Sequence, residues 1–414
     1  MELKKPYTDL TGIENNFTKL YGEVTQGQID RYNALFSKFK KTFGADCAYI
    51  ASSSGRVEVC GNHTDHNGGR VVSCAISLDT LAMFLPTEDN VVHIKSEGYN
   101  DIIVDLNGEE KEKIGTSPAL VRGVAVALKN KGYKVGGFNA CFTSNVLGGA
   151  GISSSASFEV LIAEIMNFLY NDGKISAETK SIVAQYSENV YFGKPCGLLD
   201  QTAIAFGGLK KLNFADKSKI EVSEIHNSLS DYTLVLINTG GSHAELTGEY
   251  ASIPQEMLGL AKQMGKDRLI DIPEDEFYAR LPEFYNKVSD RAITRSIHFY
   301  NENKRVDTIA NSLENNDYDS FLKAISESGI SSLCKLQNCY VAGSSEQPIP
   351  KALSIAERFL NGGANRVHGG GFAGTTLNIV KNDNLDSFIK EMNAFYNEED
   401  IIPLKVRSVG TIVL

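Results

Sequence analysis

At residues 55–69 the sequence reads Gly-Arg-Val-Glu-Val-Cys-Gly-Asn-His-Thr-Asp-His-Asn-Gly-Gly, a polar cluster between two glycine turns. The apolar side chains before position 61 alternate as in a β-strand, and Gly61 then permits a turn. Asn62, His63, Asp65 and His66 therefore project from one loop, 61–69, and loops of this kind often carry binding residues.

The composition indicates a globular protein of two domains. The chain has 414 residues, of which 42% are apolar and 22% charged, and this length suits two domains of roughly 150 to 200 residues each. Its net charge of -10 argues against a nucleic-acid partner, whose phosphates require a basic surface. The seven cysteines form no Cys-x-x-Cys pair, which is typical of reduced thiols in a cytoplasmic protein. Without a signal peptide or a long uncharged apolar run, no membrane partner is expected.

The apolar pattern predicts strands and helices that do not alternate regularly. This mixture favours an α+β fold over a doubly wound parallel sheet. Strands are expected at 47–60, 71–85, 91–94, 102–106, 138–143, 232–237 and 375–380, and the main helices at 118–128, 176–192, 249–264, 282–311, 318–328 and 385–396.

A second loop, at 145–153, is rich in glycine and serine and leads from a predicted strand into a predicted helix. Backbone N–H groups and the positive end of the helix dipole bind phosphate at such a junction. The loop is not a Walker motif, because no Gly-Lys-Ser/Thr follows it. A serine-capped helix that binds nothing is the alternative interpretation of this stretch.

The residue types in loop 61–69 allow two further interpretations. His63, Asp65 and His66 match part of the His-x-His-x-Asp-His pattern of dinuclear zinc hydrolases, although the first histidine of that pattern falls at Gly61. The other interpretation is a polar turn whose side chains bond backbone amides.

Three more residues attract attention outside these loops. Asp200 ends an apolar stretch, where an unpaired carboxylate is costly to bury, so it is expected to cap or bind something. Glu188 and Tyr250, taken singly, are more typical of a solvated helix face and of packing.

Four motifs together resemble those of the galactokinases, within the wider GHMP family of small-molecule kinases. Residues 55–69 resemble the galactokinase signature, in which Gly-Arg-Val leads to Gly-Glu-His-Thr-Asp-Tyr-Asn. Residues 148–156, Gly-Gly-Ala-Gly-Ile-Ser-Ser-Ser-Ala, are similar to the GHMP phosphate loop. Residues 196–201, Cys-Gly-Leu-Leu-Asp-Gln, and residues 369–374, Gly-Gly-Gly-Phe-Ala-Gly, are similar to two further motifs, and all four follow the family's order.

The resemblance implies a two-domain α+β GHMP kinase fold with the active site between the domains. Residues 1–207 would form a ribosomal-S5-like domain with the sugar and phosphate loops, and residues 208–414 a ferredoxin-like domain. The resemblance also implies ATP and Mg²⁺ as cofactors, and transfer of the γ-phosphoryl group to the anomeric hydroxyl of galactose. The expected partners are thus a small-molecule sugar and ATP, and the protein is expected to act as a monomer.

The same resemblance assigns roles to individual residues. Asp200 would be the catalytic carboxylate and Arg56 its cationic partner, which should lower the pKa of Asp200 and keep it ionised. Ser155 and Glu188 offer the hard oxygen ligands that Mg²⁺ prefers. The sugar would contact Asn62, His63, Asp65, Gly197 and Tyr250, and the nucleotide phosphates would lie against Gly148, Gly149, Ala150, Gly151, Ser153, Ser154 and Ser155.

Two positions depart from the family pattern and open alternatives. Asn62 stands where the family has a glutamate that touches the sugar's 6-position, and His66 replaces a tyrosine. A carboxylate would repel a uronic acid whereas an amide would not, so galacturonate is the alternative substrate. A metal-dependent hydrolase and a non-catalytic sugar sensor are the remaining alternatives, although the retained Asp200 and Arg56 favour catalysis.

Overall fold

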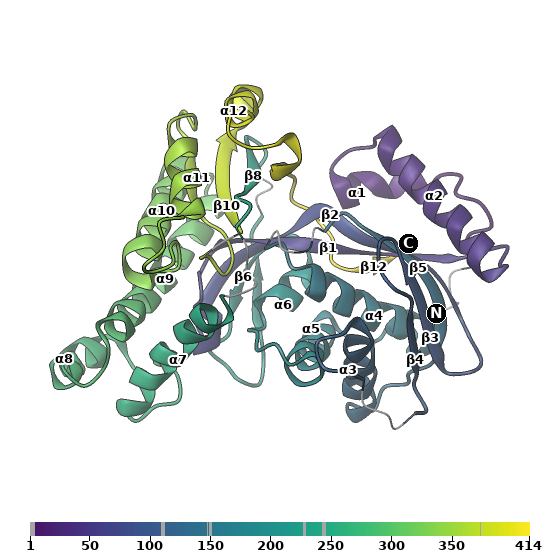
Figure 1. Cartoon of the computed structure of the whole chain (residues 1–414), viewed down its shortest axis with the longest axis horizontal. Helices are drawn as coiled ribbons and strands as arrows, with labels where there is room; N and C mark the ends of the chain where they lie inside the picture. Colours follow the sequence, from purple (N-terminus) through teal and green to yellow (C-terminus); the bar gives the residue numbers. More distant parts are fainter. Residues whose placement is uncertain are drawn as a thin grey trace.

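The structure of the chain, a computed structural model, describes residues 5–108, 112–146, 148, 151–226, 229–241, 246–372 and 374–414. Within these ranges the chain forms a sheet of eight strands and a sheet of four, and helices pack around both. Figure 1 shows the larger sheet extending to the right and the smaller one standing to its left. The prediction of an α+β fold is confirmed.

The strands of the larger sheet are antiparallel except for one neighbouring pair: β1 (Tyr49–Cys60), β2 (Arg70–Pro86), β3 (Val91–Ser96), β4 (Ile102–Asp105), β5 (Phe138–Ser144), β6 (Leu209–Asn213), β7 (Glu221–Glu224) and β12 (Ile412–Val413). Their order is β12-β1-β2-β5-β3-β4, β6 pairs with β2 and β7, and β3 is parallel to β5. The β1–β2 pairing shifts register between Ser54 and Arg56 and between Glu58 and Cys60. Such bulges often re-aim side chains next to active sites.

Helices cover both faces of the larger sheet: α1 (Phe17–Tyr21), α2 (Gln26–Phe43), α3 (Ser117–Asn130), α4 (Ser154–Tyr170), α5 (Ala177–Tyr186) and α6 (Leu199–Phe206). Figure 1 shows α1 and α2 on one side of the sheet and α3 to α6 on the other. On the first side, Phe17 and Phe39 pack with Ile50 and Met83. Burial of one such side chain stabilises the fold by roughly 1.5–3 kcal/mol.

The smaller sheet has the order β11-β8-β10-β9, with β8 (Tyr232–Asn238), β9 (Ala364–Val367), β10 (Thr375–Lys381) and β11 (Ile401–Leu404). Its apolar residues alternate between two faces. Leu234 and Leu236 pack with α9 (Asp290–Glu314) and α10 (Tyr318–Ser331). Val235 and Ile237 pack with α11 (Pro348–Glu357) and α12 (Leu385–Met392). Beyond α9 lie α7 (Thr247–Gln263) and α8 (Glu274–Phe284), which share a separate apolar cluster with it.

One apolar cluster joins the two sheets. Val57 and Val59 of β1 pack with Ile309 of α9 and Leu377 of β10. The strand that leads into loop 61–69 is therefore held by elements of both domains, and the position of this loop depends on how the domains meet.

Two sequence predictions about boundaries are wrong. A domain boundary after residue 207 would separate β6 and β7 from their own sheet, because Leu209–Asn213 pairs with β2. The chain enters the smaller sheet only at β8, and β12 returns to the larger one. The helix predicted at 282–311 is two helices, because Ser289 accepts a hydrogen bond from the Ala292 N–H and begins α9 after a break.

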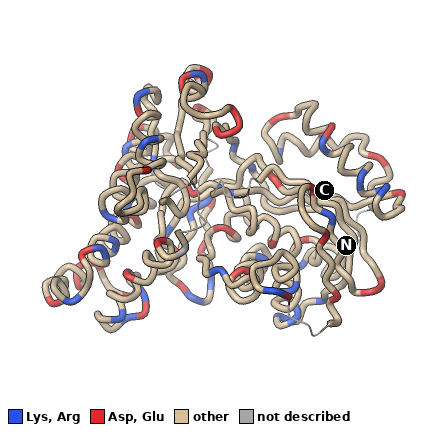
Figure 2. Tube along the Cα trace, viewed as in Figure 1, with Lys and Arg blue, Asp and Glu red and all other residues tan. Residues whose placement is uncertain are grey.

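The charged residues are distributed over both domains. Figure 2 shows acidic and basic residues interspersed along the outer helices of both domains, so the net charge of -10 is spread over the molecule. In the part of the chain that the structure describes, no helix has both the length and the apolar character needed to cross a membrane.

Candidate active site

Arg56 and Asp200 form an ion pair at the centre of the candidate site. Arg56 lies in β1 at a register shift, and Asp200 lies in the first turn of α6. The Arg56 Nε is 2.8 Å from the Asp200 Oδ1, and the Ser153 hydroxyl donates to Oδ2. Burial acts to raise the pKa of Asp200, but the charge of Arg56 and the Ser153 hydrogen bond outweigh it and lower the pKa. Asp200 is therefore a carboxylate at neutral pH, and its side chain is 34% exposed.

Ser153 connects loop 145–153 to this ion pair. It precedes α4 with a φ of 65°, in the left-handed region, and its side chain caps no N–H of the helix. Arg56 donates a side-chain hydrogen bond to the carbonyl of Gly151, and its backbone N–H donates to Ile152 O at 3.2 Å. The simple serine-capped helix is thus not what the structure contains, because the Ser153 hydroxyl is used by Asp200.

The N-terminus of α4 is suited to hold phosphate. The first N–H groups of a helix have no partner within the helix, and together with the helix dipole they attract anions. Arg56 adds a positive charge beside them. Of the predicted nucleotide-binding residues, Gly148, Gly151, Ser153, Ser154 and Ser155 lie at this junction, whereas Gly149 and Ala150 lie outside the described residues.

Ser155 and Glu188, the two residues that the resemblance assigns to Mg²⁺, lie together. The Ser155 hydroxyl donates to Glu188 Oε1 at 2.9 Å, and Lys194 Nζ lies 3.0 Å from the same oxygen. Gln201 Nε2 donates to the other oxygen at 2.9 Å. The Glu188 side chain is only 3% exposed, so it does not belong to a solvated helix face.

The donor set at Glu188 fits Mg²⁺. Magnesium prefers oxygen ligands at about 2.0–2.1 Å in an octahedron, which separates adjacent ligands by about 2.9 Å. The ammonium that pairs with this carboxylate belongs to Lys194, whose side chain is 61% exposed, so it can leave the carboxylate to a metal ion. Among the described residues, no group of three His, Cys, Asp or Glu side chains is placed to hold a metal ion. A zinc site of the hydrolase type needs three or four such ligands, whereas Mg²⁺ commonly takes one or two and completes its shell with phosphates and water.

His63 occupies a strained position in loop 61–69. Its φ is 58°, and a non-glycine residue in this region costs about 1–3 kcal/mol. Its Nε2 lies 3.1 Å from the carbonyl of Gly370, and since a carbonyl can only accept, Nε2 carries the hydrogen. Burial, assisted by the neighbouring His66, lowers the pKa of His63 to about 4. The ring is therefore neutral at pH 7, and Nδ1 is an acceptor.

Asp65, Gly197 and Tyr250 lie around the same region. Asp65 Oδ1 accepts a hydrogen bond from the His66 N–H at 2.9 Å. Gly197 lies so close to Asp65 that a Cβ at this position would collide with Oδ2. The Tyr250 hydroxyl donates to Gly371 O at 2.8 Å. His63 and Tyr250 thus both bond to loop 368–374, the third glycine-rich segment.

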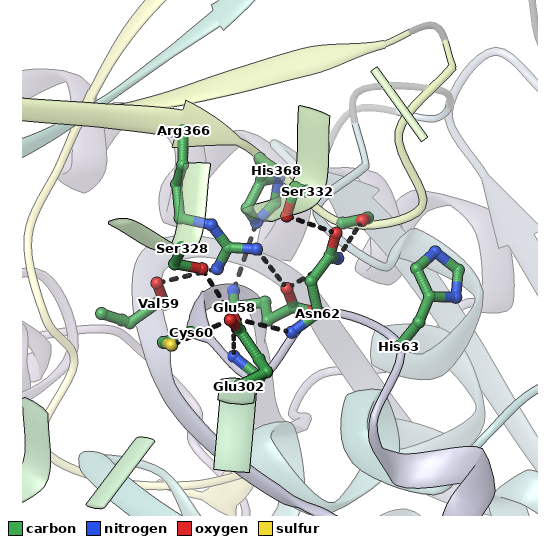
Figure 3. Close-up of polar contacts among 12 residues, drawn as sticks. Glu58, Val59, Cys60, Asn62, His63, Glu302, Ser328, Ser332, Arg366 and His368 are labelled. Atoms are coloured by element: carbon green, nitrogen blue, oxygen red, sulfur yellow. Dashed lines mark hydrogen bonds and ion pairs between the residues drawn. The ribbon is translucent and has the colours of Figure 1, made fainter. Parts of the chain in front are cut away.

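The structure places Asn62 differently from the sequence prediction. Its side chain is 0% exposed. Its Nδ2 donates to Glu58 Oε1 at 2.9 Å and to Gly369 O at 2.7 Å, and its Oδ1 accepts from Asn338 at 2.7 Å. Figure 3 shows Asn62 inside this cluster, with His63 on the opposite side of the loop. Because protein groups engage both ends of the amide, the geometry does not support a contact between Asn62 and the sugar's 6-position.

The sequence prediction missed the buried charges around Asn62. Arg366 of β9 lies 3.2 Å from Glu58 Oε1 and donates to Val59 O at 2.9 Å. His368 accepts from the Glu58 N–H at 3.2 Å. A lone carboxylate within the apolar strand 57–60 was the available signal. Its partner is 308 positions away, which a single sequence does not reveal.

Comparisons with known proteins agree with this geometry. Residues 37–86 match the galactokinase galactose-binding signature, and residues 119–208 match the N-terminal domain of the GHMP kinases. A galactokinase from Clostridium beijerinckii is 31% identical over 382 residues, which span 90% of this chain and 95% of the relative.

Solved structures share the fold. The crystal structure of Lactococcus lactis galactokinase complexed with galactose matches with a TM-score of 0.81 and 26% identity, over 92% of this chain and 100% of that one. The mevalonate kinase of Methanococcus jannaschii matches with a TM-score of 0.60 and 16% identity, over 86% and 98% of the two chains.

An α+β fold with a helix N-terminus beside an ionised carboxylate, together with the match to the N-terminal domain of the family, puts the chain in the class of GHMP-type small-molecule kinases. Within that class, the residues of β1 and loop 61–69 belong to the matched galactose-binding signature. The chain belongs to the galactokinase family. The resemblance drawn from four sequence motifs is thereby confirmed.

Proposed function

We propose that the protein is an ATP-dependent galactokinase, which transfers the γ-phosphoryl group of ATP to the anomeric hydroxyl of galactose and releases galactose 1-phosphate and ADP. The cluster of Arg56, Asp200 and Ser153 beside the N-terminus of α4 carries this proposal. Family membership supports galactose as the sugar.

Asp200 would act on the sugar hydroxyl. Phosphoryl transfer depends on positioning and charge stabilisation more than on covalent chemistry. A hydroxyl held against Asp200 gives its hydrogen to the carboxylate while its oxygen attacks the γ-phosphorus. Arg56 and Ser153 each bond one carboxylate oxygen and so fix its direction.

The nucleotide phosphates would lie at the start of α4, against the residues between positions 148 and 155. Ser155 and Glu188 would hold Mg²⁺, which when bound supplies positive charge against the phosphates. Arg56 lies within reach of the same region through its bond to Gly151 O. Its guanidinium would stabilise the negative charge of the transferring group.

The sugar would lie against His63, Asp65, Gly197 and Tyr250. The neutral His63 leaves Nδ1 to accept a hydrogen bond from a hydroxyl. The galacturonate alternative required Asn62 to face the 6-position, and the buried, fully engaged amide lends it no support.

An ADP-release assay across galactose, galacturonate, N-acetylgalactosamine and glucose tests this proposal. Turnover should be highest with galactose and roughly 10²–10⁴-fold lower in an Asp200→Asn preparation, which controls for contaminating kinases. Preference for galacturonate would overturn the substrate assignment. Galactose binding without turnover in the wild type would instead identify a sugar sensor.

We also propose that the protein acts as a monomer in the cytoplasm. All seven cysteines are unpaired, which suits a reducing compartment. Light scattering on the purified full chain tests the oligomeric state: a mass near 45.1 kDa is expected, and twice that mass would contradict the proposal.

A further inference from the structure

Backbone groups of loop 61–69 form hydrogen bonds with side chains of the other domain. Glu302, in the middle of α9, accepts hydrogen bonds through Oε1 from Gly61 N at 3.1 Å, Asn62 N at 3.4 Å and the Cys60 thiol at 3.2 Å. Figure 3 shows Glu302 directed at this turn, with Ser328 bonded to the same oxygen. One carboxylate oxygen thus collects donors from two elements of the chain.

Glu302 is buried yet ionised. Burial acts to raise the pKa of Glu302, but nearby positive charges outweigh burial and hold the pKa below its ordinary value. These charges are His298, when its ring is protonated, and Arg305 and Arg366 at every pH. Arg305 Nε donates to Oε2 at 2.7 Å. The carboxylate therefore presents a full negative charge to the N–H groups of the turn, which makes these hydrogen bonds stronger than neutral ones.

His298 bonds the backbone carbonyl of the same residue, Asn62. It lies one helical turn before Glu302 on α9, and its Nε2 is 3.0 Å from Asn62 O. Because that carbonyl can only accept, Nε2 carries the hydrogen and Nδ1 accepts from the Ser331 hydroxyl at 2.8 Å. Burial lowers the pKa of His298 to about 4, so the ring keeps this neutral form at pH 7.

The next residue along the chain is His63, whose backbone is in the left-handed region. A strained residue of this kind persists only where its surroundings fix it. Here the N–H and the C=O of Asn62 are both fixed by α9, and the His63 ring is tied to Gly370 O. α9 can therefore fix the direction of the His63 side chain without contacting the sugar.

We propose that Glu302 and His298 are positioning residues for sugar binding. From the second domain they fix the backbone N–H and C=O of Asn62, and so hold His63 and Asp65 in the geometry that receives the sugar. This inference rests on the proposed function, because it concerns the same site. It places a determinant of sugar affinity in a helix that carries none of the four family motifs.

The proposal differs from a purely structural role in what it predicts for the two ligands. A general loss of folding would weaken galactose and ATP binding together. Displacement of loop 61–69 alone weakens galactose binding and spares the nucleotide, whose proposed site lies at the start of α4.

Isothermal titration of the full-length protein with galactose, and separately with ATP and Mg²⁺, tests this. Glu302→Gln keeps the shape of the side chain but removes its charge, and it should weaken galactose binding by about tenfold or more, as expected for loss of one charge-assisted hydrogen bond. The ATP affinity should stay within about twofold of the wild type, well under the tenfold that a lost charge-assisted hydrogen bond costs. Equal losses for both ligands, or no loss for galactose, would overturn the proposal.

A matched control and a conservative pair sharpen the experiment. Glu164→Gln removes the carboxylate of a different ion pair, formed with Lys180 of α5, in which the Glu164 side chain is 12% exposed, and it should lower the thermal midpoint without changing either affinity. His298→Gln keeps a donor near the Nε2 position and should bind galactose better than His298→Leu. Equal binding by these two variants would contradict the role of His298, even if Glu302→Gln does not fold. Failure of the wild type itself to bind galactose would instead refute the proposed function.

Discussion

The Arg56 Nε lies 2.8 Å from the Asp200 Oδ1, although 144 positions separate the two residues. This contact joins β1, the strand that leads into loop 61–69, to α6, which begins within the Cys-Gly-Leu-Leu-Asp-Gln segment. Since Ser153 bonds the second oxygen of Asp200, three of the four motifs recognised in the sequence meet at one carboxylate.

Replacement of Asp200 should separate chemistry from binding. Asp200→Asn keeps the shape of the side chain but cannot accept a proton from the sugar hydroxyl. Loss of a positioned base costs typically 10²–10⁴-fold in rate, and the ATP site at α4 remains. We therefore expect kcat for ADP release to fall by roughly that factor, with ATP affinity unchanged in titration calorimetry. A variant with near-normal turnover would remove Asp200 from the mechanism.

Replacement of Arg56 should change the pH dependence. Arg56 lowers the pKa of Asp200, and activity requires the ionised carboxylate, so the wild type loses activity as the pH falls through this low pKa. In Arg56→Gln the pKa rises, and the acidic limb of the kcat/KM profile should move to higher pH. Arg56→Lys keeps a positive charge and should show a smaller shift. An acidic limb that stays in place in Arg56→Gln would show that another group controls it.

The same pair should affect stability with a defined sign. Because the folded-state pKa of Asp200 is depressed, its contribution to the free energy of unfolding is present above the unfolded-state pKa and is lost as the pH falls through the folded-state pKa. Urea unfolding at several pH values should therefore show a smaller acid-induced loss of stability in Arg56→Gln than in the wild type.

Gly197 should tolerate no side chain. In Gly197→Ala the new Cβ meets the carboxylate of Asp65, so we expect KM for galactose to rise by about tenfold, which corresponds to roughly 1.4 kcal/mol, while KM for ATP changes little. Gly259→Ala in α7 is a matched control, because its Cβ would meet no atom within 4 Å. An unchanged KM for galactose in Gly197→Ala would mean that Asp65 does not contact the sugar.

Glu188 should control the metal requirement. Glu188→Gln removes the charge that faces Ser155 and Lys194, and we expect the affinity for ATP in the presence of Mg²⁺ to fall by about tenfold, the effect of roughly 1.4 kcal/mol. Binding of ATP in EDTA should be unaffected, because no metal ligand is then in use. Equal losses with and without Mg²⁺ would indicate a contact with the nucleotide instead of the metal.

The sequence was informative where chemistry is local. Loop 61–69, the serine-rich start of α4 and the position of Asp200 follow from short patterns, because turns, caps and apolar periodicity act over a few residues. The break between α8 and α9 was missed although Ser289 offers a cap, because apolar periodicity continues across it. The burial of Asn62 could not be predicted, since its environment comes from Asn338 and Gly369, which lie more than 270 positions away. The domain boundary failed for the same reason, because only pairing with β2 shows that β6 belongs to the larger sheet.

The contact between Asn62 and Glu58 predicts how this chain would respond to the glutamate that its family has at position 62. Asn62→Glu places a second carboxylate against Glu58 Oε1, which now accepts from the amide at 2.9 Å, and against the carbonyl of Gly369. Burial already raises the pKa of Glu58 despite the neighbouring Arg366. An uncompensated buried charge costs about 3–5 kcal/mol, so the free energy of unfolding of Asn62→Glu in urea should fall by that order.

Exchange of the two side chains should recover much of this loss. In Glu58→Asn/Asn62→Glu one carboxylate and one amide again face each other, and Arg366 and Asn338 remain as nearby donors. A double-mutant cycle should then show a favourable coupling of about 1–3 kcal/mol, because residues in direct contact are not additive. Glu58→Asn alone leaves Arg366 without its carboxylate partner, so the free energy of unfolding of this single variant should also fall. Additive single effects, with no recovery in the double variant, would show that Asn62 is kept for a reason other than its contact with Glu58.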